Sequence, residues 1–564
     1  MQTAYCLTVG EYCTGKVESS RSVGILYDGP ELQAETHYDV KVTVWDNHGN
    51  EASCESFFET GVQDWNGAKW IGQSAEDMGF TPSMLGVYKV SYKLKIEEGS
   101  VRAGFYFAMD DERLMDRNRN IYGIKNKPGE GYVYLETDIS GLAAGEAAVL
   151  NIYRPGLSAN DTASVPAFTM AIPGLTRENA HQEHIYYMSM VLGDLDIYLD
   201  QEDDAHRINQ PDPNSPVPPM FRKASVPVNP YGTGSDYVCF TFLNKFGPMI
   251  PEGQAASVTD IVVRNYRRPC NVIYSENMDH SGNSQPILRK KFSVNGAVST
   301  ARLYVTARGI YEAFIDGTRV ADDWFNPGST QYNKTHMYQA YDITNLLGEG
   351  ENAIGIMLAE GWWMGNFSFE ADFWNYFGDR LSALAKIVIC YEDGRKETIV
   401  SDETWKIITD GPVLFANFFQ GQHHDMIREQ ELEGFAEPDF DDSGYKYAAE
   451  VIADETTTAA GTVTSFTFGG PRVEHMDFIN ETKLIGQVGP NVKRVKELTA
   501  VSVQKIRPGM FIYDMGQNIA GVPKVTIRNG VRGQKVIFRF AEMLYPDSPE
   551  YENLKGMLMI ENLR

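Results

Sequence analysis

Runs of alternating apolar and polar residues recur along the chain, and this period of two limits the fold more than any other feature of the sequence. The clearest run is YDVKVTVW at 38–45, which the turn residues NHGN at 47–50 follow. Successive side chains of a strand point to opposite faces of a sheet, so this run fits a strand with one buried face. Because long helical patterns are few, the sequence predicts an all-β fold.

The length of the chain predicts several domains, because 564 residues exceed what one hydrophobic core supports. We expect several β-sandwich domains in series: a fibronectin type III-like unit at 1–62, a connector at 63–83, an inserted lectin-like or laminin-G-like sandwich at 84–288, a sandwich at 289–455 and a last sandwich at 470–564. The first unit is short for its type. It is therefore expected to be incomplete at its N-terminal end.

Composition excludes several classes of function. The net charge of -26 argues against nucleic acid as a partner, which needs Lys and Arg to neutralise phosphates, and disfavours anionic membranes. No apolar run is long enough to span a bilayer, and the first residues lack the basic start and apolar core of a signal peptide. A cytoplasmic location is therefore favoured. The six cysteines show neither paired metal-ligand spacing nor the density of a disulfide scaffold.

The stretch 303–378 is the most distinctive part of the chain. Its strand-like run at 311–315 ends at Asp316-Gly317, a dipeptide typical of a type I′ hairpin turn. Further on, a polar loop contains three of the eight tryptophans, namely Trp362, Trp363 and Trp374. Aromatic faces cover the C–H surface of a sugar while amides and carboxylates bind its hydroxyls. The loop therefore predicts a sugar site, although the same tryptophans could instead close the end of a sandwich core.

No motif in the sequence identifies catalytic residues. A nucleophile elbow, a phosphate-binding loop and a His-Glu-x-x-His zinc motif are all missing from the sequence. With 76 acidic residues, a pair of carboxylates for glycoside hydrolysis could be placed almost anywhere. Counting carboxylates therefore decides nothing.

Several ordered segments resemble one known family. They are FETG at 58–61, AKWI at 68–71, LRKKF at 288–292, GIYE at 309–312, NPGSTQY at 326–332, YQAYDIT at 338–344, GWWMG at 361–365, DFDDS at 439–443 and YDMGQN at 513–518. In this order they resemble the N-terminal half of the bacterial α-L-rhamnosidases of glycoside hydrolase family 78. The resemblance is strong over 289–564, moderate over 1–72 and weak over 84–288, which looks like an insertion.

This resemblance implies an enzyme that removes terminal α-L-rhamnosyl residues from plant glycosides with inversion. In that family the catalytic carboxylates lie in a C-terminal (α/α)6 barrel, and the segments up to Arg564 supply no run of helices for one. We therefore expect the accessory β-rich part of such an enzyme, with two rhamnosidase accessory sandwiches and no catalytic residue. The alternative is a stand-alone carbohydrate-binding or scaffold protein without hydrolase activity.

The resemblance also implies candidate ligand residues, because the 289–455 domain of some members is a calcium-assisted rhamnose-binding module. Calcium takes several oxygen ligands, and a sugar can donate two hydroxyls to the same ion. Asn375 is the leading candidate to hold Ca²⁺, followed by Gln331 and Asn333, with Trp362 or Trp363 as the stacking surface. Gln331 stands where Asp is common, which removes a charge that calcium favours. The expected partners are L-rhamnose-containing glycosides.

Overall fold

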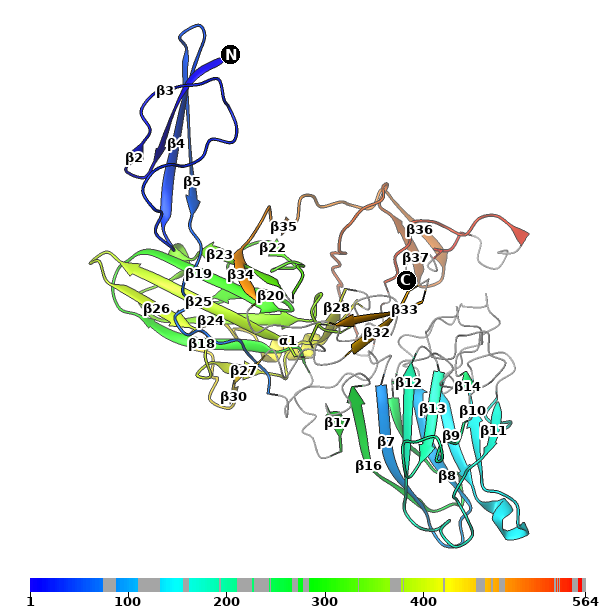
Figure 1. Cartoon of the computed structure of the whole chain (residues 1–564). Coiled ribbons are helices and arrows are strands. Elements are labelled where there is room, and N and C mark those ends of the chain that lie inside the picture. Colours follow the sequence, from blue (N-terminus) through cyan, green and yellow to red (C-terminus); the bar gives the residue numbers. More distant parts are fainter. Residues whose placement is uncertain are drawn as a thin grey trace.

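A computed structural model confirms the all-β fold and its division into several β-sheet bodies (Figure 1). The structure describes residues 1–74, 88–109, 132–155, 162–191, 194–209, 226–227, 243, 245–265, 272–276, 284–332, 334–365, 377–378, 380–418, 421–452, 462–467, 470–475, 482–531, 534, 536, 538–549 and 556–559. The helices with described bounds are short: η2 (Ser140–Ala144), η4 (Thr344–Leu346) and α1 (Met426–Glu431).

The N-terminal body is one antiparallel sheet. Its strands are β1 (Gln2–Val9), β2 (Tyr12–Cys13), β3 (Val17–Glu18), β4 (His37–Asp46) and β5 (Glu51–Glu59), in the order β2-β1-β4-β5 with β3 also on β1. The predicted strand at 38–45 lies within β4. Residues 1–62, expected to be a fibronectin type III-like unit that is incomplete at its N-terminal end, contain this single sheet, and Phe57 of β5 is 63% exposed. The alternating pattern thus predicted the strands correctly but carried no information on a second sheet packed against them.

The central body is a sandwich of two sheets. One sheet has the order β21-β20-β24-β18-β27-β30, with strands Thr318–Arg319, Ile310–Ile315, Gly350–Ala359, Ile287–Val294, Lys406–Ile408 and Lys446–Tyr447. The other has the order β31-β6-β25-β19-β23-β34, with strands Ala449–Glu450, Ile71–Gly72, Ser382–Tyr391, Val298–Arg308, Thr335–Asp342 and Lys483–Gly486, and β26 (Lys396–Val400) on β25. Apolar side chains of both sheets form one core, to which Leu303, Ile356 and Ile387 belong.

The hairpin predicted at Asp316-Gly317 is confirmed. β20 and β21 pair with Ile315 opposite Thr318, so the turn consists of these two residues. Asp316 has φ +45° and Gly317 has φ +74°, as a type I′ turn requires at both central positions. Two short strand pairs also belong to this body: β22 (Asp323–Trp324) with β35 (Val492–Lys493), and β28 (Val413–Asn417) with β29 (Gly421–His424).

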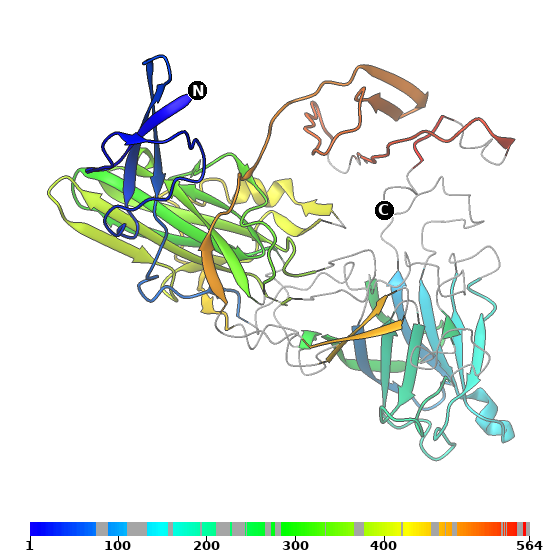
Figure 2. The ribbon, with the colours of Figure 1, turned by 45° about the horizontal axis from the view of Figure 1, so that its top comes forward.

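The chain adds one strand, β6, to the central sandwich before it forms the separate body that contains β7 to β17. β6, inside the segment expected to be a connector, pairs with β25 and β31, and the sandwich resumes only at β18. The strands from β7 to β17 therefore form an insertion between two strands of one sandwich, and they lie apart from it in both ribbon views (Figures 1 and 2).

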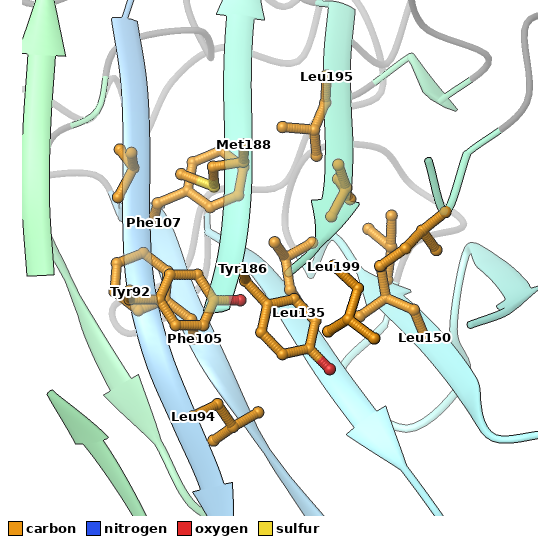
Figure 3. Close-up of a cluster of buried hydrophobic side chains, with 14 of the residues drawn as sticks. Tyr92, Leu94, Phe105, Phe107, Leu135, Leu150, Tyr186, Met188, Leu195 and Leu199 are labelled. Atoms are coloured by element: carbon orange, nitrogen blue, oxygen red, sulfur yellow. The ribbon is translucent and has the colours of Figure 1, made fainter. Parts of the chain in front are cut away.

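The inserted body is itself a sandwich. One sheet has the order β11-β10-β9-β8-β15, with strands Phe168–Ala171, Val149–Tyr153, Val133–Asp138, Arg102–Met109 and Lys245–Met249. The other has the order β14-β13-β12-β7-β16-β17, with strands Val226–Pro227, Asp194–Leu199, His184–Val191, Tyr88–Ile96, Ala256–Asn265 and Val272–Ser275. Figure 3 shows the core between them, in which the Tyr92 ring stacks on Phe105 at 4.3 Å and on Tyr186 at 5.3 Å.

Two strands of the C-terminal part pair with the central body. β34 and β35 lie in the segment assigned to the last sandwich, but β34 pairs in parallel with β23, and β35 pairs with β22 of the central body. The remaining described strands form two hairpins, β32 (Thr462–Thr467) with β33 (Gly470–His475) and β36 (Ser502–Arg507) with β37 (Met510–Asp514). Throughout the described part of the chain, no helix is long and apolar enough to cross a membrane.

Candidate functional site

The turn that carries the two adjacent tryptophans follows directly on strand β24. Gly361 forms a bridge with Asn417 at the end of β28 and has φ +57°, a conformation that glycine adopts without strain. A Cβ at this position would lie 2.6 Å from Cγ2 of Ile310, at the start of β20. The turn is therefore pressed closely against the neighbouring strand.

Trp363 points into the core. Its side chain is among the largest fully buried ones at 1% exposure, and its Nε1 donates a hydrogen bond to the carbonyl oxygen of Arg380 at 3.0 Å. The rings of Tyr332 and Phe377 lie 5.6 Å and 6.4 Å from it. These contacts cover its faces, so the stacking surface expected at this position is not available. Trp363 closes the end of the sandwich core instead.

Trp362 is half-buried, packs against the same core and belongs to a partly exposed aromatic cluster. Its ring lies 4.9 Å from that of Phe418, which lies 5.1 Å from Phe325, which in turn lies 5.9 Å from Trp324. We call these four residues the aromatic surface cluster. Phe325 is 38% exposed, and the other three are half-buried. The cluster gives the sandwich an apolar surface beside polar groups, as a sugar-binding surface requires.

Phe325 is held in an unusual conformation by buried polar neighbours. Its φ is +59°, which is rare for a bulky residue and requires support from the surrounding structure. The next residue, Asn326, provides it: its Nδ2 donates to the Tyr341 hydroxyl at 2.8 Å, and its carbonyl accepts from the Tyr311 amide at 2.9 Å. The exposed ring of Phe325 is thus positioned by a network below it.

A carboxyl group lies buried behind the cluster. Glu360 is 3% exposed and accepts a hydrogen bond from Nδ2 of Asn417 at 2.8 Å. Burial raises the pKa of Glu360 to about 8, and the hydrogen bond from Asn417 offsets only part of this shift. The group is therefore mostly protonated at neutral pH. Gly365 leaves room for it, because a Cβ there would lie 2.0 Å from Oε2 of Glu360.

An arginine and a histidine are buried on the other side of Trp363. The guanidinium of Arg308 lies 4.3 Å from the Trp70 ring and 5.6 Å from that of Trp363, and it donates to the carbonyl of Val451 at 3.0 Å. His336 packs nearby, and burial lowers its pKa to about 3, with a further contribution from Arg308. The imidazole is therefore neutral under ordinary conditions, and this cluster serves the core rather than a proton transfer.

The structure brings together only some of the predicted ligand residues. Gln331 is exposed, and its neighbour Tyr332 packs on Trp363, so its loop borders the tryptophan turn. Asn333 and Asn375 lie outside the described residues, and so does Trp374. The predicted juxtaposition of Gln331 with Asn375 is therefore not tested.

The described residues near the turn do not fit a calcium ion. Calcium prefers several charged oxygens, and the buried carboxyl here, Glu360, is mostly neutral at pH 7 and already accepts from Asn417. Within the described part of the chain, no group of three or more His, Cys, Asp or Glu residues could hold a metal ion.

Sequence reasoning missed Phe325, Phe418 and the Glu360–Asn417 pair. The signal for Glu360 was present, since an acidic residue directly follows the apolar strand at 350–359. Phe325 and Phe418 carried no such signal, because they join Trp362 from segments far apart in the chain.

Comparison with known proteins gives three domain matches in order along the chain. Residues 1–64 match the family described as the Rha78A-like, N-terminal immunoglobulin domain, 296–466 the alpha-L-rhamnosidase N-terminal domain, and 504–558 the bacterial alpha-L-rhamnosidase concanavalin-like domain. The first of these assigns an immunoglobulin-type domain to the unit expected to resemble fibronectin type III.

Individual relatives agree with these matches. An alpha-L-rhamnosidase of Streptomyces avermitilis is 27% identical over 559 residues, which are 95% of this chain and 46% of that protein. One from Alteromonas sp. (strain LOR) is 32% identical over 46% of this chain and 25% of its own length. The crystal structure of the Streptomyces avermitilis alpha-L-rhamnosidase complexed with L-rhamnose shares the fold, with a TM-score of 0.51 at 21% identity over 92% of this chain and 46% of that one. The chain thus spans less than half the length of these relatives.

Proposed function

This chain carries the N-terminal domains of the bacterial α-L-rhamnosidase family, and we propose that it is the accessory β-rich part of an enzyme that hydrolyses terminal α-L-rhamnosyl residues of plant glycosides. The observation that carries this proposal is the order of the three domain matches along one chain. The role of this part is to position and support the hydrolytic site, which we do not assign to any residue of this chain.

The chemistry of an inverting glycosidase supports leaving the hydrolytic site unassigned in this chain. Such an enzyme needs an acid and a base about 6.5–9.5 Å apart, so that a water molecule fits between the base and the sugar. Glu360 is the buried carboxyl of the aromatic loop, and among the described residues its contact is with the amide of Asn417 rather than with a second carboxylate. A neutral carboxyl can donate a proton but leaves the base unassigned.

Two experiments test this proposal. The purified chain is assayed with an aryl α-L-rhamnoside, and we expect no turnover; clear turnover would place catalysis within residues 1–564 and overturn the proposal. The encoding locus is then read beyond the codon for Arg564. An open frame that continues into a helical region supports the accessory role, whereas a stop codon with no such region nearby contradicts it.

A second candidate function is carbohydrate binding by this chain alone, and the aromatic surface cluster favours it. The exposed ring of Phe325 and the half-buried ring of Trp362 offer apolar faces, and the exposed residue Gln331 lies in the loop that borders the tryptophan turn. Calorimetry with L-rhamnose, with and without a chelator, tests this function. If binding heat is observed with the unaltered chain and disappears in Phe325→Ala, L-rhamnose binds at the aromatic surface cluster. If the heat also disappears when a chelator is added, binding requires calcium. No heat in either condition removes sugar binding as a function.

A further inference from the structure

Two cysteines of the N-terminal sheet lie next to each other. Cys6 is on β1 and Cys13 is on the edge strand β2, and their Sγ atoms are 3.3 Å apart. Cys13 pairs with Thr8, two residues after Cys6, so both cysteines point to the same face of the sheet. A disulfide bond is about 2.05 Å long, so a small approach of the two sulfurs would join them.

The two sulfurs differ in accessibility and in acidity. Cys13 is exposed, whereas Cys6 is half-buried. The backbone N–H of Gly15 donates to Sγ of Cys13 at 3.3 Å and, together with nearby side chains, lowers the pKa of the Cys13 thiol. The pKa of Cys6 is raised, mainly by its hydrogen bond with Cys13. Of the pair, Cys13 is thus the more accessible and the more readily ionised, which are the two properties of an attacking thiol.

We propose that Cys6 and Cys13 form a redox-active dithiol, which closes into an intramolecular disulfide by exchange with a low-molecular-weight disulfide such as oxidised glutathione. The geometry of the hairpin carries this proposal. Ring closure joins β2 covalently to β1 and holds the edge of the N-terminal sheet. This modification site is independent of any role of the chain in glycoside hydrolysis.

The exchange proceeds in two balanced steps. The Cys13 thiolate attacks one sulfur of oxidised glutathione, a mixed disulfide forms, and one glutathione thiolate leaves. The Cys6 thiolate then attacks Sγ of Cys13 and expels the second glutathione. Two protein thiols are oxidised to one disulfide, one glutathione disulfide is reduced to two thiols, and the two protons pass to the leaving thiolates.

The test uses the whole chain equilibrated with oxidised glutathione and then alkylated and mapped by mass spectrometry. We expect a peptide cross-link between Cys6 and Cys13, the loss of the mass of two hydrogen atoms, and two fewer of the six thiols in the denatured chain. Reduction by dithiothreitol should restore both thiols. The proposal is overturned if both cysteines stay alkylatable after this treatment, or if the cross-link joins either of them to another cysteine.

Matched variants separate the two roles. Cys6→Ser removes the resolving thiol, so the chain should accumulate the mixed disulfide between Cys13 and glutathione. Cys54→Ser removes another exposed cysteine of the same sheet and should leave the cross-link unchanged. If Cys6→Ser shows no mixed disulfide while the unaltered chain cross-links, the assignment of Cys13 as the attacking thiol is wrong.

Discussion

Nζ of Lys386, in the middle of strand β25, contacts the carboxylate of Glu35, in the turn before β4, and donates to the carbonyl oxygen of Asp64 at 2.6 Å. The lysine side chain is 2% exposed and the glutamate 8%. β25 is buried almost throughout, because the sandwich core covers one face and residues of the N-terminal region cover the other. The buried ion pair is therefore one of the contacts that join the first body to the second.

Breaking this pair should destabilise the chain strongly. Glu35→Gln leaves the Lys386 ammonium buried without its counter-charge, which should cost about 3 kcal/mol of unfolding free energy. The double variant Glu35→Gln/Lys386→Met should recover part of this loss, because no buried charge remains. Urea denaturation measures all three free energies.

Lys396 provides the control for that experiment. It contacts the same carboxylate at 3.1 Å, but its side chain is 52% exposed. Lys396→Met should therefore cost less than about 1 kcal/mol. Equal losses for Lys396→Met and Glu35→Gln would show that burial does not determine the strength of this junction.

A second ion pair of the junction should make stability depend on pH. Arg302 Nε donates to both carboxylate oxygens of Glu59, at 2.8 Å and 2.9 Å. Burial alone would raise the pKa of Glu59, but the hydrogen bonds from Arg302 and His37 outweigh it, so the pKa is below its ordinary value of 4.5. The stabilisation is present above pH 4.5 and is lost as the pH falls through the lower folded pKa.

Glu59→Gln tests this dependence, since a neutral amide cannot titrate. We expect the variant to lose about 2 kcal/mol at pH 7 and to show a shallower decline of the thermal midpoint below pH 4.5 than the unaltered chain. Parallel declines would mean that other carboxylates account for the acid sensitivity.

The buried carboxyl of Glu360 should make stability depend on pH in the direction opposite to that expected for Glu59. Its pKa of about 8 in the folded chain lies above the ordinary value of 4.5, so folding favours the protonated form. Its contribution to stability is complete below pH 4.5 and falls as the pH rises to about 8, above which it is constant. In Glu360→Gln this decline should disappear. Superimposable stability curves for the two proteins between those pH values would refute the buried, neutral state.

The two adjacent tryptophans should respond differently to truncation. Trp363→Ala leaves a cavity in the sandwich core and should cost about 4 kcal/mol. Trp362→Ala removes a half-buried ring of the aromatic surface cluster and should cost about 1.5 kcal/mol. Chemical denaturation of both variants compares them directly, and equal losses would contradict their different burial.

Much of the fold was predictable because local patterns encode it. The alternation at 38–45 gave strand β4, and Asp316-Gly317 gave the β20–β21 turn, since few dipeptides accept positive φ at both positions. The stretch 303–378 was also recognisable as the distinctive part of the central sandwich. These features depend on residues close together in the chain, where backbone conformation and side-chain direction follow directly from residue type.

The functions of individual side chains depended on the tertiary structure. Trp362 and Trp363 are adjacent and chemically identical, and only tertiary packing buries Trp363 fully while it leaves Trp362 half-buried. The aromatic surface cluster draws on three separate segments, and Lys386 meets Glu35 across 351 positions. The sequence alone determined where strands form and what family they resemble. Which side chains meet was decided by the folded chain, because burial and contact are properties of three-dimensional packing that no local pattern contains.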